Sequence, residues 1–155
     1  MHNQKDPFLN GLSAYYPDQI FVLDKMAEAV SLLTQYDDYQ AFCKSPLKYE
    51  HTICHVSEAR LFTNLDKSRI RFHISSNRFL AGMIRIIMGK LLEIGRGNLE
   101  LSQFEHFLKS KTKPETIIPV YAQGLYLSKV TYPYLDLPVK SEYANALFRE
   151  INIPV

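Results

Sequence analysis

The longest hydrophobic pattern in the chain predicts a helix from Phe79 to Ile94. When this segment is projected at about 100° per residue, its apolar side chains gather on one wide face. That face consists of Leu80, Met83, Ile84, Ile87, Leu91 and Ile94. The sequence Gly95-Arg96-Gly97-Asn98 follows, and glycine readily adopts the left-handed conformation that ends many helices. We therefore expect a buried helix that ends close to residue 95.

Two shorter segments have the same helical spacing. The first begins at Asp24, a suitable N-cap, and its pattern fades near Tyr36. The second runs from Ser102 to Lys111, where Ser102 and Glu105 form a candidate capping box. The residues that these helices turn inward are Met26, Ala29, Val30 and Leu33 in the first and Phe104, Phe107 and Leu108 in the second.

Alternation of apolar and polar residues predicts three strands. The first runs from Thr52 to Phe62, and the third runs from Gly124 to Tyr132, before Pro133. The second contains Ile70, Phe72 and Ile74 alternating with Arg69, Arg71 and His73, and the polar residues 64–68 form the turn before it. On the first strand, one face is expected to carry Ile53, His55, Ser57 and Ala59.

The order β-β-α-α-β with tight turns between strands favours the α+β class, an antiparallel sheet with helices packed on one face. We expect one domain over residues 1–138, followed by a tail over residues 139–155. The tail has helical spacing at Ala144, Leu147, Phe148 and Ile151.

Composition narrows the protein class. A chain of 155 residues that is 46% hydrophobic can bury a core of its own. No run approaches the roughly 20 apolar residues that cross a bilayer, and the first residues lack a signal-peptide core, so we expect a cytoplasmic protein. Two cysteines are too few for a disulfide framework. The spacing of Cys43, His51, Cys54 and His55 is too irregular to favour a zinc site.

The polar side of the predicted helix 79–94 and its flanks are unusual because small residues surround an arginine. This stripe consists of Arg78, Ala81, Gly82, Arg85, Gly89 and Arg96. An interior glycine costs about 1 kcal/mol relative to alanine. Two explanations remain open. Either another segment crosses the helix closely beside solvated arginines, or Arg85 lies in a shallow groove and binds a phosphate or carboxylate with two parallel hydrogen bonds.

Two sequence blocks resemble one enzyme family. The segment Arg78-Phe79-Leu80-Ala81-Gly82-Met83-Ile84-Arg85-Ile86-Ile87-Met88-Gly89-Lys90-Leu91-Leu92-Glu93-Ile94-Gly95-Arg96-Gly97 resembles the signature helix of tRNA pseudouridine synthases of the TruA type. The block Ala122-Gln123-Gly124-Leu125-Tyr126-Leu127, followed by Tyr132-Pro133, is similar to the family's Gly-Leu-Tyr-Leu strand. Weaker similarity extends the resemblance to about Pro138.

The resemblance implies isomerisation of uridine to pseudouridine in the anticodon arm of tRNA, without a metal or an organic cofactor. Enzymes that act on a base take it out of the stack. By resemblance, Arg85 pairs with a catalytic aspartate and orients it, and Leu125 lines the base pocket. The members are usually homodimers. The basic residues that we expect to face RNA phosphate are Arg78, Arg96, Lys44, Lys48 and Lys113.

One departure from the family is important. The family's aspartate lies in an Arg-Thr-Asp-x-Gly motif upstream of the signature helix, and no aspartate of this chain has that context. We therefore expect the chain to be the C-terminal half of the catalytic region, inactive alone. Two alternatives remain open: a catalytically silent RNA-binding or dimerisation module, and a small-molecule enzyme that uses Arg85 to bind an anionic substrate.

Overall fold

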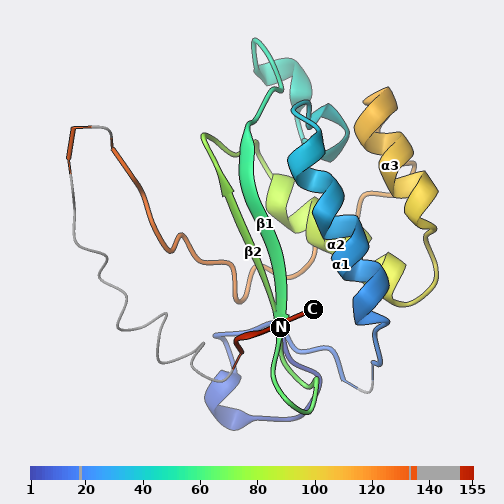
Figure 1. The fold of residues 1–155 in the computed structure, drawn as a ribbon, viewed down its shortest axis with the longest axis vertical. Helices are drawn as coiled ribbons and strands as arrows, with labels where there is room; N and C mark the ends of the chain where they lie inside the picture. The colour runs from blue at the N-terminus through green and yellow to red at the C-terminus, as the bar shows by residue number, and fades with distance from the viewer. Residues whose placement is uncertain (18, 133, 136–150) are drawn as a thin grey trace.

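The computed structural model describes residues 1–17, 19–132, 134–135 and 151–155, and it confirms the α+β class. Within these residues, three helices lie on one face of a small antiparallel sheet with strand order β2-β1-β3 (Figure 1). The helices are α1 (Leu23–Leu32), α2 (Met83–Gly95) and α3 (Leu101–Ser110). The strands are β1 (Val56–Thr63), β2 (Ile70–Ser76) and β3 (Ile153–Pro154). Short 3₁₀ turns are η1 (Pro7–Leu9), η2 (Leu33–Gln35), η3 (Gln40–Phe42) and η4 (Pro46–Lys48).

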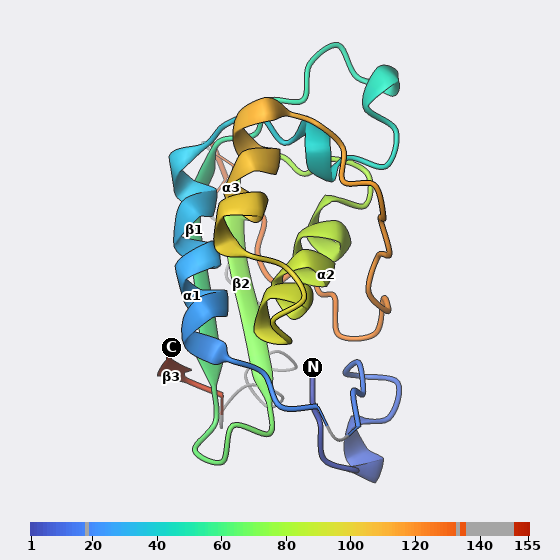
Figure 2. The same ribbon diagram turned by 90° about the vertical axis from the view of Figure 1, so that its right-hand side faces the viewer.

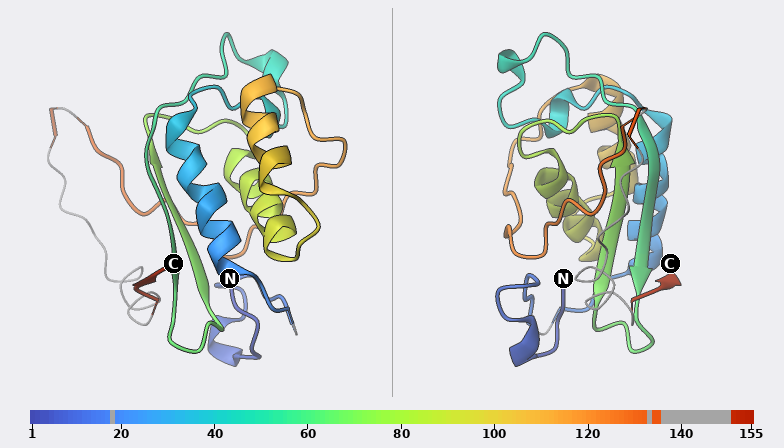
Figure 3. Two further views of the ribbon diagram at one scale, coloured as in Figure 1. Left: turned by 45° about the vertical axis from the view of Figure 1, so that its right-hand side comes forward. Right: turned by 90° about the vertical axis from the view of Figure 1, so that its left-hand side faces the viewer.

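The hairpin of β1 and β2 turns its apolar face toward the helices. Leu61 pairs with Phe72 across the two strands, and Ala59 pairs with Ile74. Residues directly opposite each other in an antiparallel pair share a face, so these four side chains form one side of the core. In the left view of Figure 3, α1 and α3 lie side by side in front of α2, and all three cover this side.

The single face predicted for the first strand does not continue to Ala59. Ile53, His55 and Ser57 are all exposed, opposite the buried Cys54 and Val56, whereas Ala59 is half-buried against the core. The pairing with β2 shifts between Val56 and Glu58. An extra residue at such a bulge reverses the alternation of side chains, so a register read from one end of the strand fails at the other end.

Helix α2 begins at Met83, four residues later than Phe79. Gly82 has φ +75°, a left-handed conformation that cannot continue a right-handed helix. The turn before it is held by a distant loop, since the Lys44 N–H donates to the Ala81 carbonyl at 2.9 Å and the Ala81 N–H donates to the Tyr49 hydroxyl at 2.9 Å. The predicted core face is confirmed, with Ile84 half-buried and the rest buried, and Ile86 and Leu92 are buried as well.

The two other helices are confirmed, but their N-terminal caps differ from the prediction. Helix α1 has Val22 at its N-cap, and Asp24 lies in the first turn, where a negative charge is favourable. The capping box of α3 consists of Glu100 and Gln103. Glu105 is engaged elsewhere: it accepts from the Tyr36 hydroxyl and from Lys109, each at 2.8 Å.

The predicted strand from Gly124 to Tyr132 is absent from the structure of that segment. Leu125, Leu127 and Val130 are 50%, 78% and 48% exposed. A strand needs a neighbouring strand for its main-chain groups. Among the described residues, the main-chain bond given for Leu125 is local, from its N–H to the Ala122 carbonyl at 3.1 Å. Within the described part of the chain, this alternating sequence therefore has no neighbouring strand with which to pair.

The last described residues extend the sheet. Strand β3 pairs antiparallel with β1, so that Pro154 lies opposite Phe62 and Ile153 lies opposite Thr63. Ile151, just before β3, is buried and is not helical. The rest of the helix predicted in the tail, including Ala144, Leu147 and Phe148, lies outside the described residues.

In the part of the chain that the structure describes, none of the helices has both the length and the apolar character needed to cross a membrane.

Candidate functional site

Arg85 lies opposite the core face of α2 and is fixed by the main chain of a distant segment. Its Nε donates to the carbonyl oxygen of Val120 at 2.6 Å, and the Val120 N–H donates back to the Arg85 carbonyl at 3.3 Å. The side chain is half-buried. Among the described residues, the structure gives no hydrogen-bond or ion-pair partner to its two terminal Nη atoms. The outer edge of the guanidinium is therefore available to a further anionic group.

Gly89 lets that segment approach α2 closely. A Cβ atom at this position would lie 2.8 Å from the carbonyl oxygen of Ile118, closer than real Cβ atoms approach. At Gly89, the stripe of small residues therefore accommodates the protein's own main chain, residues 117–121. This is the close crossing that was one of the two explanations for the stripe. Among the described residues, the terminal nitrogens of Arg85 remain the groups of this stripe without a hydrogen-bond partner beside that segment.

The N-terminal end of α2 gathers three of the predicted RNA-binding residues. The guanidinium of Arg78 lies 5.5 Å from the centre of the Tyr49 ring. Tyr49 follows η4, whose last residue is the exposed Lys48, and Lys44 is bound through its main chain to Ala81. Figure 2 shows η4 projecting at the same end of the molecule as the start of α2. Because a helix N-terminus carries partial positive charge, this end of α2 is doubly suited to an anionic partner.

Arg96 lies at the opposite end of α2, so the predicted basic residues do not form a single cluster. Its Nε donates to the Gln19 side-chain oxygen at 2.8 Å. Its guanidinium carbon lies 5.8 Å from the centre of the Tyr16 ring and 5.5 Å from that of Phe21. Arg96 remains exposed but is oriented by these neighbours.

The last two predicted site residues lie on segments outside the helices. Lys113 is exposed just after α3. Leu125 belongs to a segment held against the N-terminal loop: a Cβ on Gly124 would lie 3.3 Å from the Ser13 Cα, and the Tyr126 hydroxyl donates to the Leu12 carbonyl at 2.6 Å. Half of Leu125 is exposed, which leaves its apolar side chain available to a ligand or to another part of the protein.

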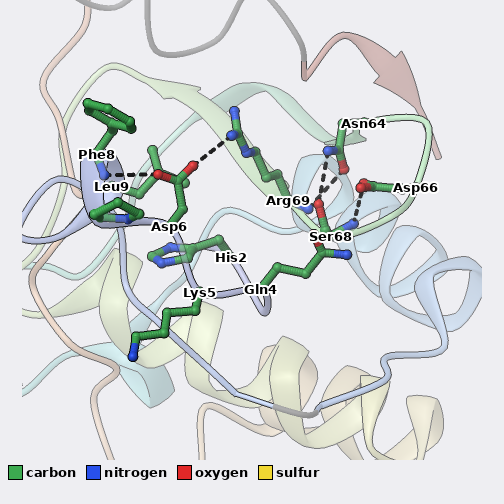
Figure 4. A pocket seen from close by; sticks show the side chains of 11 residues that line it. His2, Gln4, Lys5, Asp6, Phe8, Leu9, Asn64, Asp66, Ser68 and Arg69 are labelled. Carbon is green, nitrogen blue, oxygen red and sulfur yellow. Dashed lines mark hydrogen bonds and ion pairs between the residues drawn. The ribbon is translucent and has the colours of Figure 1, made fainter.

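A separate pocket of about 310 Å³ lies between the N-terminal segment and the turn that joins β1 to β2. Figure 4 shows the Arg69 side chain reaching Asp6 across it. The Asp6 carboxylate accepts from Arg69 Nη2 and from the Phe8 N–H, each at 2.9 Å. This pocket contains none of the predicted site residues, and its ion pair ties the N-terminal segment to the hairpin.

Among the residues that the structure describes, no three His, Cys, Asp or Glu side chains are grouped so that they could hold a metal ion.

The family model described as tRNA pseudouridine synthase matches residues 29–133. The match contains β1, β2, all three helices except the first residues of α1, and every predicted site residue. The chain belongs to the tRNA pseudouridine synthase family.

Individual relatives extend the family match over most of the chain. The chain is 32% identical over 130 residues to a tRNA pseudouridine synthase A of Porphyromonas gingivalis. The aligned region covers 84% of this chain and 51% of that protein. The protein of the same name from Parabacteroides distasonis is 33% identical over 137 residues, with 88% and 53% covered. That of Staphylococcus aureus is 29% identical over 133 residues, with 86% and 48% covered. The chain thus spans about half the length of the curated relatives that it matches.

The contacts of this pseudouridine synthase chain include groups that sequence patterns did not indicate. Val120 holds Arg85 through its carbonyl oxygen, a group that every residue has, so no side-chain pattern could reveal it. Tyr16 lies in a stretch without helical or strand periodicity, and its approach to Arg96 depends on the fold. The sequence signals for this region were the pairing of an arginine with nearby glycines and the resemblance of residues 78–97 to the family's signature helix.

Proposed function

We propose that this chain is the C-terminal part of an enzyme that isomerises uridine to pseudouridine in tRNA. In this proposal, Arg85 binds and orients a catalytic aspartate supplied by an upstream half. The supporting observation is the state of the Arg85 guanidinium: its Nε is bound to Val120, and its two Nη atoms have no partner among the described residues. Two parallel N–H donors on a fixed plane match the two oxygens of a carboxylate.

Orientation of that carboxylate would matter for the chemistry. The reaction breaks the glycosidic bond at N1 of uracil and remakes it at C5, so the aspartate must stay in place while the base rotates. A guanidinium anchored at Nε cannot swing freely, and positioning of reacting groups contributes a large share of catalysis. Leu125 in this proposal contacts the flipped base with its exposed apolar side chain.

Several broader features belong to the same proposal. Lys44, Lys48, Arg78, Arg96 and Lys113 contact phosphates of the anticodon arm of tRNA, which fixes the position of the RNA without reading its sequence. The enzyme acts as a homodimer in the cytoplasm and needs no cofactor. Residues 1–138 form the C-terminal catalytic domain, and residues 139–155 form a tail.

The test is release of tritium from tRNA labelled at C5 of uridine, because formation of the new bond at C5 expels that hydrogen. The protein to be measured is the chain joined to the upstream half that full-length family members carry. Wild-type protein should release tritium, and Arg85→Ala should lower kcat by about 100-fold or more, as loss of a group acting on a transition state does. A folded wild-type protein that binds tRNA and releases no tritium would contradict the proposal.

Arg60→Ala is the matched control. Arg60 is also an arginine, but its side chain is 64% exposed on the sheet and pairs with Glu58. Its removal should leave release within about twofold of the wild type, as expected for an exposed ion pair of small energy. Equal losses in the two variants would assign the Arg85 effect to overall charge rather than to the site.

A further inference from the structure

The segment that anchors Arg85 packs loosely against the described part of the core. Residues 117–121 contact α2 through main-chain groups, and their outward side chains are exposed, with Ile118 at 69% and Tyr121 at 64%. Ile117 and Val120 are only partly buried against the core. The orientation of Arg85 therefore depends on whatever fixes this segment at its end near Tyr121.

Tyr16 packs on that end of the segment. The centres of the Tyr16 and Tyr121 rings lie 6.0 Å apart. Burial raises the pKa of Tyr16, and the Tyr121 backbone together with the positive charges of Arg96 and Arg85 acts against this shift. The ring of Tyr16 thus lies beside that of Tyr121, and Tyr16 lies within the electric field of Arg85. Figure 2 shows the N-terminal segment, in blue, directly below the turn of the segment that follows α3.

Tyr16 is itself fixed from two directions. Its N–H donates to the His2 carbonyl at 2.9 Å, which holds its main chain against the N-terminal segment. On the other side, the Arg96 guanidinium lies over its ring at 5.8 Å and is held by Gln19. A half-buried aromatic ring with both ends restrained can act as a rigid support for a neighbouring loop.

We propose that Tyr16 is a positioning residue for Arg85, which it holds in orientation by supporting residues 117–121. This inference rests on the proposed role of Arg85 in orienting the catalytic aspartate. The contacts form one chain: Tyr16 packs on Tyr121, and the carbonyl of the adjacent Val120 accepts from Arg85 Nε. Replacement of Tyr16 is therefore expected to change the orientation of the Arg85 guanidinium, although Tyr16 itself does not contact RNA in this proposal.

The first test measures how firmly residues 117–121 are held against α2, in the full 155-residue chain without tRNA. Hydrogen exchange of the Val120 amide and of the Arg85 Nε–H is followed by nuclear magnetic resonance. Tyr16→Leu should speed both exchanges by about tenfold or more, because opening of a poorly packed segment becomes easier. Tyr16→Phe keeps the ring that packs on Tyr121, so both exchanges should stay within about twofold of the wild type. Tyr15→Leu is the control, since the Tyr15 ring stacks on His2 instead. Unchanged exchange in Tyr16→Leu would overturn the proposal.

The second test uses tritium release by the chain joined to the upstream half. Tyr16→Leu should lower kcat by about 10-fold to 100-fold, the size expected for a misplaced catalytic group, while KM for tRNA changes by less than about twofold. In an Arg85→Ala background, the same substitution should cause no further loss, because residues that act through one another are not additive. Independent, multiplicative losses would overturn the proposal. If the wild type releases no tritium, the proposed function fails, and the exchange measurement alone still decides whether Tyr16 supports Arg85.

Discussion

At the scale of single residues, the carboxylate of Asp38 joins three separate parts of the chain. It accepts from the Thr52 hydroxyl, from the Gln40 N–H at 3.1 Å and from Lys111 Nζ at 2.9 Å. Burial acts to raise the pKa of Asp38, but the hydrogen bonds from Thr52, Lys111 and Gln40 together lower this pKa below its ordinary value of 3.8. The charged form of Asp38 thus stabilises the packing of the end of α3 against the segment that leads into β1.

The lowered pKa predicts how the stability of Asp38→Asn depends on pH. A carboxyl whose pKa is lower in the folded state contributes stability fully above its unfolded-state pKa of about 3.9, and this contribution is lost as pH falls through the folded-state pKa. The wild type should therefore exceed Asp38→Asn in free energy of unfolding at pH 6, and the difference should shrink below pH 4. Urea denaturation at several pH values measures it. Asp37→Asn is the control because Asp37 forms an exposed pair with His55, and a similar pH dependence there would refute the role of Asp38.

At the scale of elements, β3 is held to the sheet by few groups, and one buried side chain dominates. Ile151 is 5% exposed, whereas Ile153 is 41% exposed two residues later. Ile151→Ala should therefore lower the free energy of unfolding by about 2 kcal/mol, the low end for a buried isoleucine. Ile153→Ala should change it by less than about 0.5 kcal/mol. Urea denaturation compares the two variants, and equal effects would mean that burial of Ile151 does not anchor β3.

The elements also differ in how far their sequences predict them. The core face of α2 was predictable because a helix satisfies its own main chain, so the spacing of apolar residues is enough. The start of α2 was not predictable, because Gly82 takes a left-handed conformation that is stabilised by a loop about 40 residues earlier in the chain. The strand predicted over residues 124–132 failed for the opposite reason: alternation shows that a segment suits a sheet, but pairing requires a neighbour elsewhere in the fold.

At the scale of the whole molecule, the sequence singled out candidate site residues, but their arrangement depends on the fold. Arg85 and Gly89 stood out together, yet the segment that lies against them is about 30 residues away in the sequence. The five basic residues expected to face RNA are divided between the two ends of α2 and the end of α3. This separation follows from the direction of α2, since Arg78 precedes its N-terminal end and Arg96 follows its C-terminal end.

The divided basic residues predict a salt dependence that can be traced to one end of the molecule. Each phosphate neutralised by a basic residue releases counterions, so the logarithm of the binding constant falls with the logarithm of salt concentration by about 0.7 to 0.9 per contact. If Lys44 and Lys48 each contact a phosphate, the double variant Lys44→Ala/Lys48→Ala should reduce the slope for tRNA binding by about 1.5. The slope is measured with the chain joined to its upstream half.

The control removes two equally exposed lysines from other elements. Lys25 lies on α1, and Lys67 lies in the turn between β1 and β2, at the end of the molecule opposite η4 (Figure 1). Lys67 has φ +57°, so Lys67→Asn is used because asparagine tolerates this conformation. Lys25→Ala/Lys67→Asn changes the net charge by the same two units.

If the salt slope of this control falls as much as that of the Lys44 and Lys48 variant, the attraction is a property of net charge, and the loop beside α2 is not a phosphate-binding surface. If only the Lys44 and Lys48 variant loses slope, tRNA lies across the N-terminal end of α2, where Arg85 lies in the first turn of the helix.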